Sequence, residues 1–166
     1  MLNQYSSHIG IVNFFPVMFG LIENEEQARA SLRVLADSNQ MLSPTGVRSL
    51  SKLDQFYLYK SNYWRGAVWI NVNFLVLRGL FTHYLPVTGL RTDDEPLASI
   101  NRLSPDSGLE LYRTLRQRLI SAVYKNWRIN GVFWEQYSDS TSLGLMTHPF
   151  NGLTSLILLV VAETYG

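Results

Sequence analysis

Two segments of this sequence combine aromatic rings with polar and acidic side chains. The first, residues 62–73, reads NYWRGAVWINVN, and the second, residues 131–139, reads GVFWEQYSD. Sugars present apolar C–H faces bordered by hydroxyl groups, so their sites combine aromatic platforms with side chains that form paired hydrogen bonds. Both segments supply this mixture, which favours a neutral, sugar-like ligand.

Glu135 is the candidate for acid–base chemistry, because it stands between Trp134 and Tyr137. We expect the aromatic walls to desolvate its carboxylate in part and to raise its proton affinity toward that of a general base. The structural alternative is a surface residue, or an ion pair with an arginine at the edge of the core.

The neighbouring residues of the first segment have the same two interpretations. Arg65 could contact a ligand or only hold its loop in place. Trp64 and Trp69 could form a sugar platform or belong to an ordinary core.

Other catalytic arrangements do not fit the sequence. His8, His83 and His148 share no metal-ligand spacing, and there is no cysteine for a thiolate, a disulfide or a zinc–sulfur site. The nucleophile elbow of serine hydrolases, the phosphate-binding glycine loop and the dinucleotide fingerprint are also missing. We therefore expect neither a metal nor an organic cofactor.

The composition indicates one well-packed domain. Of the 166 residues, 46% are hydrophobic and 16% are charged, and 14 basic residues balance 13 acidic ones. This profile argues against disorder and against a nucleic-acid partner, which would need a basic surface. The most apolar run, residues 153–162, is roughly half as long as a membrane-spanning helix, and the N-terminus does not resemble a signal peptide. No membrane contact is expected within this chain.

Apolar residues recur at helical spacing in five segments joined by long polar loops. The predicted helical segments are residues 9–22, 25–36, 66–84, 108–127 and 152–164. Pro16 should kink or restart the first of them. The loops are expected at residues 42–63, 86–106 and 128–149, and loops of this length in a compact domain usually carry function.

Apolar stripes predict which helix faces are buried. The residues expected to face the core are Ala28, Leu32, Leu35, Val68, Val72, Leu75, Leu80, Leu111, Leu115, Leu119 and Val123. Arg113, Arg116 and Arg118 are expected to face solvent. The helices are too apolar to be covered by one another alone. The prediction is an all-α fold that forms part of a larger helical array.

Several blocks resemble one enzyme family. Residues 63–73 closely resemble the YWRG-x-x-W-x-N-x-N signature of the mannosyl-oligosaccharide glucosidases, or processing α-glucosidases I. Residues 43–50 (SPTGVRSL), 133–137 (FWEQY), 149–152 (PFNG) and 162–165 (AETY) resemble further blocks of that family, in the same order. The resemblance covers nearly the whole chain except residues 86–106.

The resemblance implies a fold and an activity. Family members are inverting hydrolases with an (α/α)6 toroid, and they remove the outermost α-1,2-linked glucose from the N-glycan precursor in the lumen of the endoplasmic reticulum. Residues 1–166 would be the C-terminal portion of the catalytic domain, a partial toroid with the site on its long loops. Full-length relatives are anchored in the membrane, outside the region that this chain matches.

The same resemblance assigns residues. The family's general base maps onto Glu135. The substrate-binding positions map onto Tyr63, Trp64, Arg65, Gly66, Trp69, Phe133, Trp134, Tyr137 and Phe150. The family's general acid is an aspartate that lies N-terminal to everything present here. The implied partners are therefore a glucosylated oligosaccharide and the missing N-terminal part, and we expect the isolated chain to be inactive and prone to aggregation.

Three departures from the family pattern bear on the site. Leu42 and Leu153 stand where relatives usually carry tryptophan, and residues 139–144 are less rich in glycine. Two alternatives from other classes are a non-catalytic carbohydrate-binding remnant of the same fold and a helical interaction domain without a ligand. Trehalase and glucoamylase share the toroid, but the sequences of their glutamate and pocket motifs are different.

Overall fold

The computed structural model describes residues 7–85 and 105–165, which form a helix-rich fold with very little sheet. The elements are η1 (Ile11–Phe14), α1 (Phe15–Met18), α2 (Glu25–Ala36), α3 (Ile70–Gly79), η2 (Leu80–Tyr84), α4 (Pro105–Asn130), β1 (Gln136–Tyr137), β2 (Gly144–Leu145), η4 (Leu153–Leu156) and α5 (Ile157–Ala162). The all-α prediction is therefore correct in its main feature.

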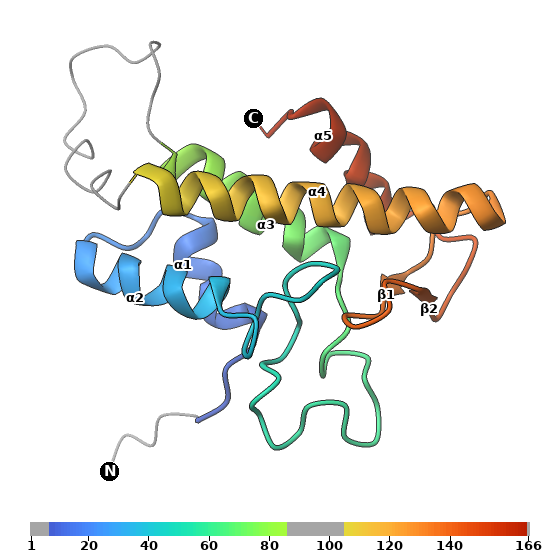
Figure 1. Cartoon of the computed structure of the whole chain (residues 1–166), viewed down its shortest axis with the longest axis horizontal. Helices are drawn as coiled ribbons and strands as arrows, with labels where there is room; N and C mark the ends of the chain where they lie inside the picture. Colours follow the sequence, from blue (N-terminus) through green and yellow to red (C-terminus); the bar gives the residue numbers. More distant parts are fainter. Residues whose placement is uncertain (1–6, 86–104, 166) are drawn as a thin grey trace.

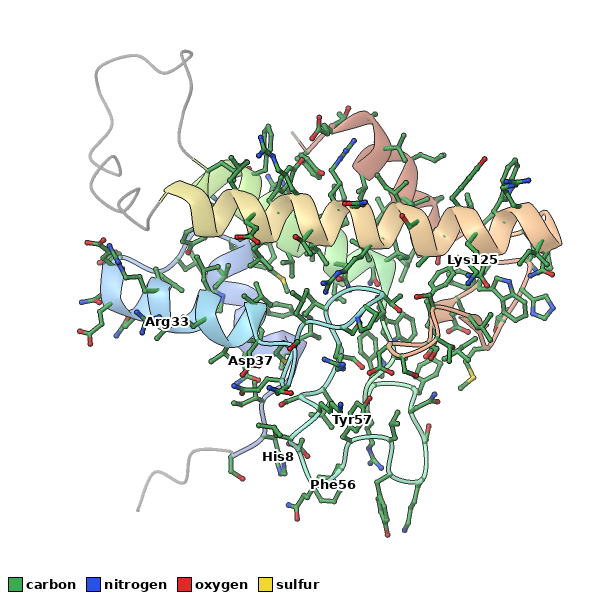
Figure 2. The ribbon with its side chains drawn as sticks, in the orientation of Figure 1. His8, Arg33, Asp37, Phe56, Tyr57 and Lys125 are labelled. Atoms are coloured by element: carbon green, nitrogen blue, oxygen red, sulfur yellow. The ribbon has the colours of Figure 1, made fainter. Side chains whose placement is uncertain are left out.

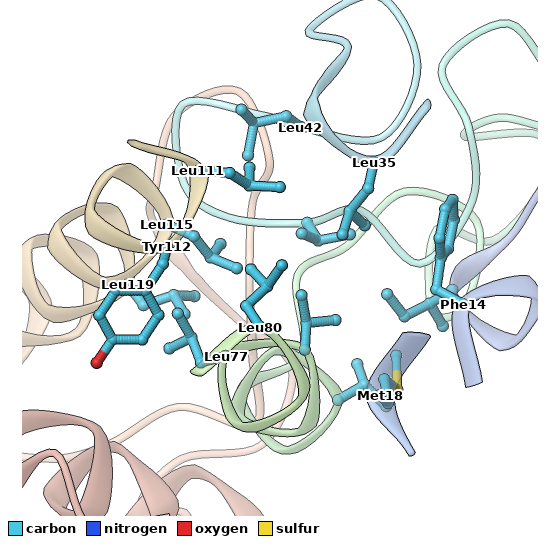
Figure 3. Close-up of a cluster of buried hydrophobic side chains, with 14 of the residues drawn as sticks. Phe14, Met18, Leu35, Leu42, Leu77, Leu80, Leu111, Tyr112, Leu115 and Leu119 are labelled. Atoms are coloured by element: carbon cyan, nitrogen blue, oxygen red, sulfur yellow. The ribbon is translucent and has the colours of Figure 1, made fainter. Parts of the chain in front are cut away.

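Helix α3 lies at the centre of the fold. The long helix α4 crosses over it, α5 packs against both α3 and α4, η4 packs against α3, and α1 and α2 lie on the opposite side (Figure 1). The core between α3 and α4 contains Leu77, Leu80, Leu115 and Leu119, all with no exposed surface (Figure 3). Burying one such side chain stabilises the fold by about 1.5–3 kcal/mol.

Helix α2 has the bounds that its sequence predicts. The side chain of Asn24 caps its N-terminus by accepting a hydrogen bond from the backbone N–H of Gln27 at 3.0 Å. The predicted core residues Ala28, Leu32 and Leu35 are all buried.

The first predicted helical segment divides at Pro16, as expected. Pro16 lies in the first turn of α1, where its missing N–H has no helical partner to lose. Helix α1 then crosses α3 so closely that a side chain at Gly79 would lie 2.6 Å from the Cα atom of Met18. Only glycine fits at that crossing.

Helix α3 begins four residues later than the predicted start at residue 66. The reason is that Val68 forms an antiparallel bridge with Tyr137, so the backbone stays extended through Trp69. The helix ends in the π-helical turn η2, which runs to Tyr84. Leu75, predicted to face the core, is only partly buried.

Helix α4 is longer than predicted and buries the predicted stripe of Leu111, Leu115, Leu119 and Val123. Arg113 faces solvent as predicted, but the prediction is wrong for two other arginines. Arg116 donates to the carbonyl oxygens of Val160 and Val161 at 3.0 and 2.9 Å. Arg118 donates to the carbonyl oxygen of Ser43 at 2.7 Å. These contacts attach α4 to α5 and to the turn at residue 43.

The C-terminal region is less helical than predicted. Within the predicted loop 128–149, β1 and β2 form a two-stranded antiparallel sheet in which Gln136 pairs with Leu145. The predicted helix 152–164 consists of η4 followed by the short helix α5. The predicted connection 86–106 lies almost entirely outside the described residues. No helix among residues 7–85 and 105–165 is both long and apolar enough to cross a membrane.

Candidate functional site

The two segments predicted to carry chemistry lie side by side. The backbone N–H of Val68 donates to the carbonyl oxygen of Tyr137 at 2.9 Å, and the N–H of Tyr137 donates back to Val68 at 3.0 Å. This reciprocal pair joins the entrance of α3 to β1. As a result, Glu135 is held next to the aromatic residues of the first segment.

The Glu135 carboxylate accepts hydrogen bonds on both of its oxygens. The hydroxyl of Tyr63 donates to Oε1, and the backbone N–H of Thr147 donates to Oε2 at 3.3 Å. The backbone N–H of Glu135 also donates to the Thr147 carbonyl oxygen at 2.9 Å. Among the described residues, no basic side chain forms an ion pair with this carboxylate. Its charge is therefore oriented but not neutralised.

These contacts reverse the predicted direction of the Glu135 pKa. The hydrogen bond from Tyr63 is the largest cause and, together with the bonds from Thr147, it holds the pKa below the ordinary value of 4.5. Partial burial acts in the opposite direction but is outweighed, because donors to a carboxylate favour its ionised form. The prediction of a raised pKa is wrong, because Glu135 lies at a solvent-accessible rim.

The aromatic residues of the first segment form an ordered group. The indole rings of Trp64 and Trp69 stack in parallel with centroids 4.2 Å apart, and Tyr63 meets Trp69 edge-on at 4.8 Å. Trp69 is 4% exposed, whereas Trp64 is 46% exposed. Trp69 is thus a core residue, and Trp64 presents an exposed indole beside Glu135's partner Tyr63.

Arg65 and Gly66 shape the loop that carries these rings. Arg65 donates to the Tyr59 carbonyl oxygen at 2.8 Å and lies over the ring of Phe56 at 5.7 Å. These contacts agree with the alternative in which Arg65 holds its loop in place and does not contact a ligand. Gly66 is buried with φ +139°, and a side chain there would lie 2.8 Å from the ring of Tyr57. Gly66 therefore supports the site through its backbone.

The loop of residues 51–65 is also anchored at its far end. The imidazole of His8 bonds to the Asp54 carboxylate at 2.8 Å, and its ring lies 5.2 Å from that of Phe56. Figure 2 shows His8, Phe56 and Tyr57 together in the loop region below the helices. The loop is thus held by defined contacts despite its lack of regular structure.

The second segment contributes a layer around Trp134. The Trp134 ring stacks on His148 with centroids 3.7 Å apart, and it covers Gly144 so closely that a side chain at Gly144 would overlap it. The hydroxyl of Thr154 donates to the Trp134 carbonyl oxygen at 2.7 Å. Leu153, one of the two leucines that depart from the family pattern, is 48% exposed beside this contact.

The remaining predicted site residues differ in accessibility. Phe133 and Phe150 are partly buried and are joined by a hydrogen bond from the Phe150 N–H to the Phe133 carbonyl oxygen at 2.9 Å. Tyr137 is fully buried, and its hydroxyl accepts from the backbone N–H of Trp134 at 3.3 Å. Tyr137 therefore supports the site from beneath. Leu42, the other leucine that departs from the pattern, is a core residue.

Sequence reasoning missed a buried ion pair beneath the site. Arg48 Nε lies 2.7 Å from Asp139 Oδ2, with side chains 5% and 4% exposed. The Tyr57 hydroxyl donates to the same oxygen at 2.5 Å, and Arg48 also donates to the Leu42 carbonyl oxygen at 2.8 Å. We call Arg48, Tyr57 and Asp139 the buried clamp. Its one sequence signal is the position of Arg48 in the block at residues 43–50.

The described part of the chain offers no cluster of metal ligands. Within residues 7–85 and 105–165, no group of three or more histidine, aspartate and glutamate side chains is arranged to hold a metal ion.

Comparison with known proteins gives the site a family context. The glycosyl hydrolase family 63 C-terminal domain matches residues 2–163. The chain belongs to glycosyl hydrolase family 63. The matched range includes both motif segments and the buried clamp.

Named relatives agree with the resemblance seen in the motifs. A probable mannosyl-oligosaccharide glucosidase of Schizosaccharomyces pombe is 36% identical over 159 residues, which are 95% of this chain and 18% of that protein. Alpha-glucosidase 2 of Arabidopsis thaliana is 34% identical over 95% of this chain and 19% of its own length. The chain thus spans about a fifth of these relatives.

A solved structure shares the fold. The glucose complex of the family 63 mannosylglycerate hydrolase from Thermus thermophilus matches with a TM-score of 0.64 and 19% identity. The match covers 94% of this chain and 32% of that one. The overall fold described above is therefore similar to that of the corresponding part of this hydrolase.

Proposed function

We propose that this chain is the base-bearing C-terminal part of an inverting α-glucosidase that removes the terminal α-1,2-linked glucose from the N-glycan precursor. The proposal rests on the position of the Glu135 carboxylate, which is held by Tyr63 and Thr147 beside the exposed indole of Trp64. An ionised, oriented carboxylate at a sugar platform can take a proton from an attacking water molecule.

Inversion requires a second carboxyl group roughly 6.5–9.5 Å from the base, to protonate the departing oxygen. Asp139 cannot be this second carboxyl group, because its side chain is buried in an ion pair with Arg48. We propose that the general acid comes from another segment of the whole enzyme. The greater length of the relatives supports this view, since this chain matches less than a fifth of the first of them.

The proposal includes a complete (α/α)6 toroid, of which this chain forms one part. Exposed apolar side chains on or next to η1, α1, α4 and α5 support it, because exposed apolar surface can pack against other protein. Examples are Val12, Phe15, Phe19, Trp127, Ile129 and Leu158, which are between 41% and 69% exposed. The endoplasmic reticulum lumen is the proposed location, because the N-glycan precursor is processed there.

The test uses the 166-residue chain alone and a complemented enzyme, in which the chain is combined with the N-terminal part of the S. pombe relative. The substrate is an oligosaccharide with a terminal α-1,2-linked glucose, and the product anomer is followed by proton NMR. We expect no turnover from the chain alone, and β-glucose as the first product of the complemented enzyme.

Two variants make this test specific. Glu135→Gln should abolish turnover in the complemented enzyme, and Glu110→Gln, an exposed glutamate on α4, should not. Turnover that persists in Glu135→Gln, or α-glucose as first product, contradicts the proposal. Sugar binding that is unchanged by Glu135→Gln, without turnover in any combination, would instead indicate a carbohydrate-binding remnant.

A further inference from the structure

We propose that Tyr63 is the positioning residue of Glu135: it fixes one oxygen of the carboxylate and leaves the group free to face water, rather than serving primarily as a sugar contact. This inference rests on the proposed function of Glu135 as the base. It changes the role that the family resemblance implies for Tyr63.

The hydrogen bonds to the Glu135 carboxylate show how Tyr63 positions it. Tyr63 binds Oε1 and the Thr147 N–H binds Oε2, so each of the two oxygens has its own donor. Two such bonds restrict rotation of the carboxylate about its last torsion. Each carboxylate oxygen has two lone pairs, so one donor per oxygen leaves acceptor capacity for a water molecule.

Tyr63 is itself held rigidly. Its carbonyl oxygen accepts a hydrogen bond of 2.8 Å from the indole N–H of Trp69. Its ring meets Trp69 edge-on at 4.8 Å and Trp64 edge-on at 6.4 Å. Since Trp69 is buried in the core, the position of the phenol is set by the core and not by the loop alone.

The phenol of Tyr63 has a single proton to donate. Because that proton is donated to Glu135, the Tyr63 hydroxyl can only accept a hydrogen bond from a sugar. The hydrogen bond to the Glu135 carboxylate in turn raises the pKa of Tyr63, so the phenol stays protonated and the donation persists. The bond favours the ionised form of Glu135, which is the form that a general base requires.

The first test measures the carboxylate directly and needs no turnover. The 166-residue chain is labelled with carbon-13 at the glutamate carboxyl carbons and studied within the complemented enzyme, and the Glu135 signal is assigned by its loss in Glu135→Gln. In Tyr63→Phe we expect the Glu135 titration midpoint to move to higher pH, because the main donor to the ionised form is lost. Tyr59→Phe, a change at an exposed tyrosine in the same loop, should leave the midpoint unchanged.

A second variant covers the case in which Tyr63→Phe does not fold. Site-specific 3-fluorotyrosine at position 63 makes the phenol a stronger donor without removing it, and it should move the Glu135 midpoint to lower pH. A Glu135 midpoint that is unaffected by the change at Tyr63 in whichever variant folds overturns the inference.

The kinetic test separates positioning from sugar binding. In the complemented enzyme, Tyr63→Phe should lower kcat about tenfold, the factor expected for the loss of one hydrogen bond of ordinary strength, with KM almost unchanged. The acid limb of the kcat/KM profile should move to higher pH. A raised KM with an unmoved acid limb would identify Tyr63 as a sugar contact and overturn the inference. If the complemented enzyme has no turnover at all, the proposed function fails, while the titration still decides the role of Tyr63.

Discussion

Glu135 and Asp139 are separated by three residues of one segment, yet the structure uses them in opposite ways. Asp139 is 3% exposed and binds the guanidinium of Arg48 and the hydroxyl of Tyr57. Glu135 lies at the rim and binds the neutral donors of Tyr63 and Thr147. A carboxylate that is matched by a buried cation holds structure together, whereas one held by neutral donors keeps its charge available for chemistry.

The comparison also explains why aromatic neighbours did not desolvate Glu135 as predicted. The rings of Trp134 and Tyr137 face other partners: Trp134 stacks on His148, and Tyr137 lies in the core. Burial falls on the residues around the glutamate rather than on its carboxylate. The buried, structural carboxylate is instead that of Asp139, which lies in a more polar stretch of the sequence than Glu135.

The largest expected effect comes from breaking the buried clamp. Asp139→Ala leaves the guanidinium of Arg48 buried without its carboxylate, so we expect the free energy of unfolding to fall by about 3–5 kcal/mol. Urea denaturation followed by tryptophan fluorescence measures the loss. The double variant Arg48→Met with Asp139→Leu removes both charges and should recover much of it. A loss below about 1 kcal/mol in Asp139→Ala would show that the pair does not hold the fold together.

A smaller effect is expected from the third member of the clamp. Tyr57→Phe keeps the ring that packs under Gly66 but removes the hydroxyl that donates to Asp139. We expect a loss of about 1 kcal/mol in the same denaturation experiment, since one hydrogen bond of ordinary strength is removed. Tyr59→Phe serves as the matched control, and equal effects of the two variants would argue against the clamp.

The acid limb of activity should follow Glu135. Its pKa is lowered by Tyr63 and Thr147, so the base stays ionised as the pH falls and protonates only below the ordinary value of 4.5. In the complemented enzyme, the acid limb of kcat/KM should therefore lie below about 4.5. An acid limb that lies well above this value would mean that the carboxylate is desolvated, as the sequence alone predicts.

The smallest effect on stability should come from the base itself. Glu135→Gln keeps the shape of the side chain at a partly exposed rim, so the free energy of unfolding should change by less than about 0.5 kcal/mol. The measurement is the same denaturation curve used for Asp139→Ala. A loss comparable to that of Asp139→Ala would remove the contrast between the two carboxylates.

The features that depend on local sequence were predictable. Helix α2 was located correctly, because the acidic and amide residues 25–27 favour a helix start and the apolar spacing marks its face. The start of α3 was misplaced, because its extended entrance depends on Tyr137, far away in the sequence. Hydrogen bonding to a distant strand outweighed the helical periodicity of residues 66–69.

The site was predictable in its residue types but not in its contacts. The aromatic and acidic composition of the two segments pointed to Glu135, and the structure brings these segments together. The direction of the Glu135 pKa depends on Tyr63, which lies 72 positions away, and no local pattern reveals that contact. The pair of Arg48 and Asp139 was missed for a similar reason, since charged residues in polar loops are usually solvated.

The bridge between Val68 and Tyr137 restricts how this site can be transplanted into another helical scaffold. Each of the two backbones supplies one donor and one acceptor to the other, so a chimera that receives only one segment would place unpaired peptide groups in its interior. Protein engineers who wish to exchange the aromatic platform must therefore move residues 43–73 and 131–147 together, because Asp139 also needs its buried partners Arg48 and Tyr57.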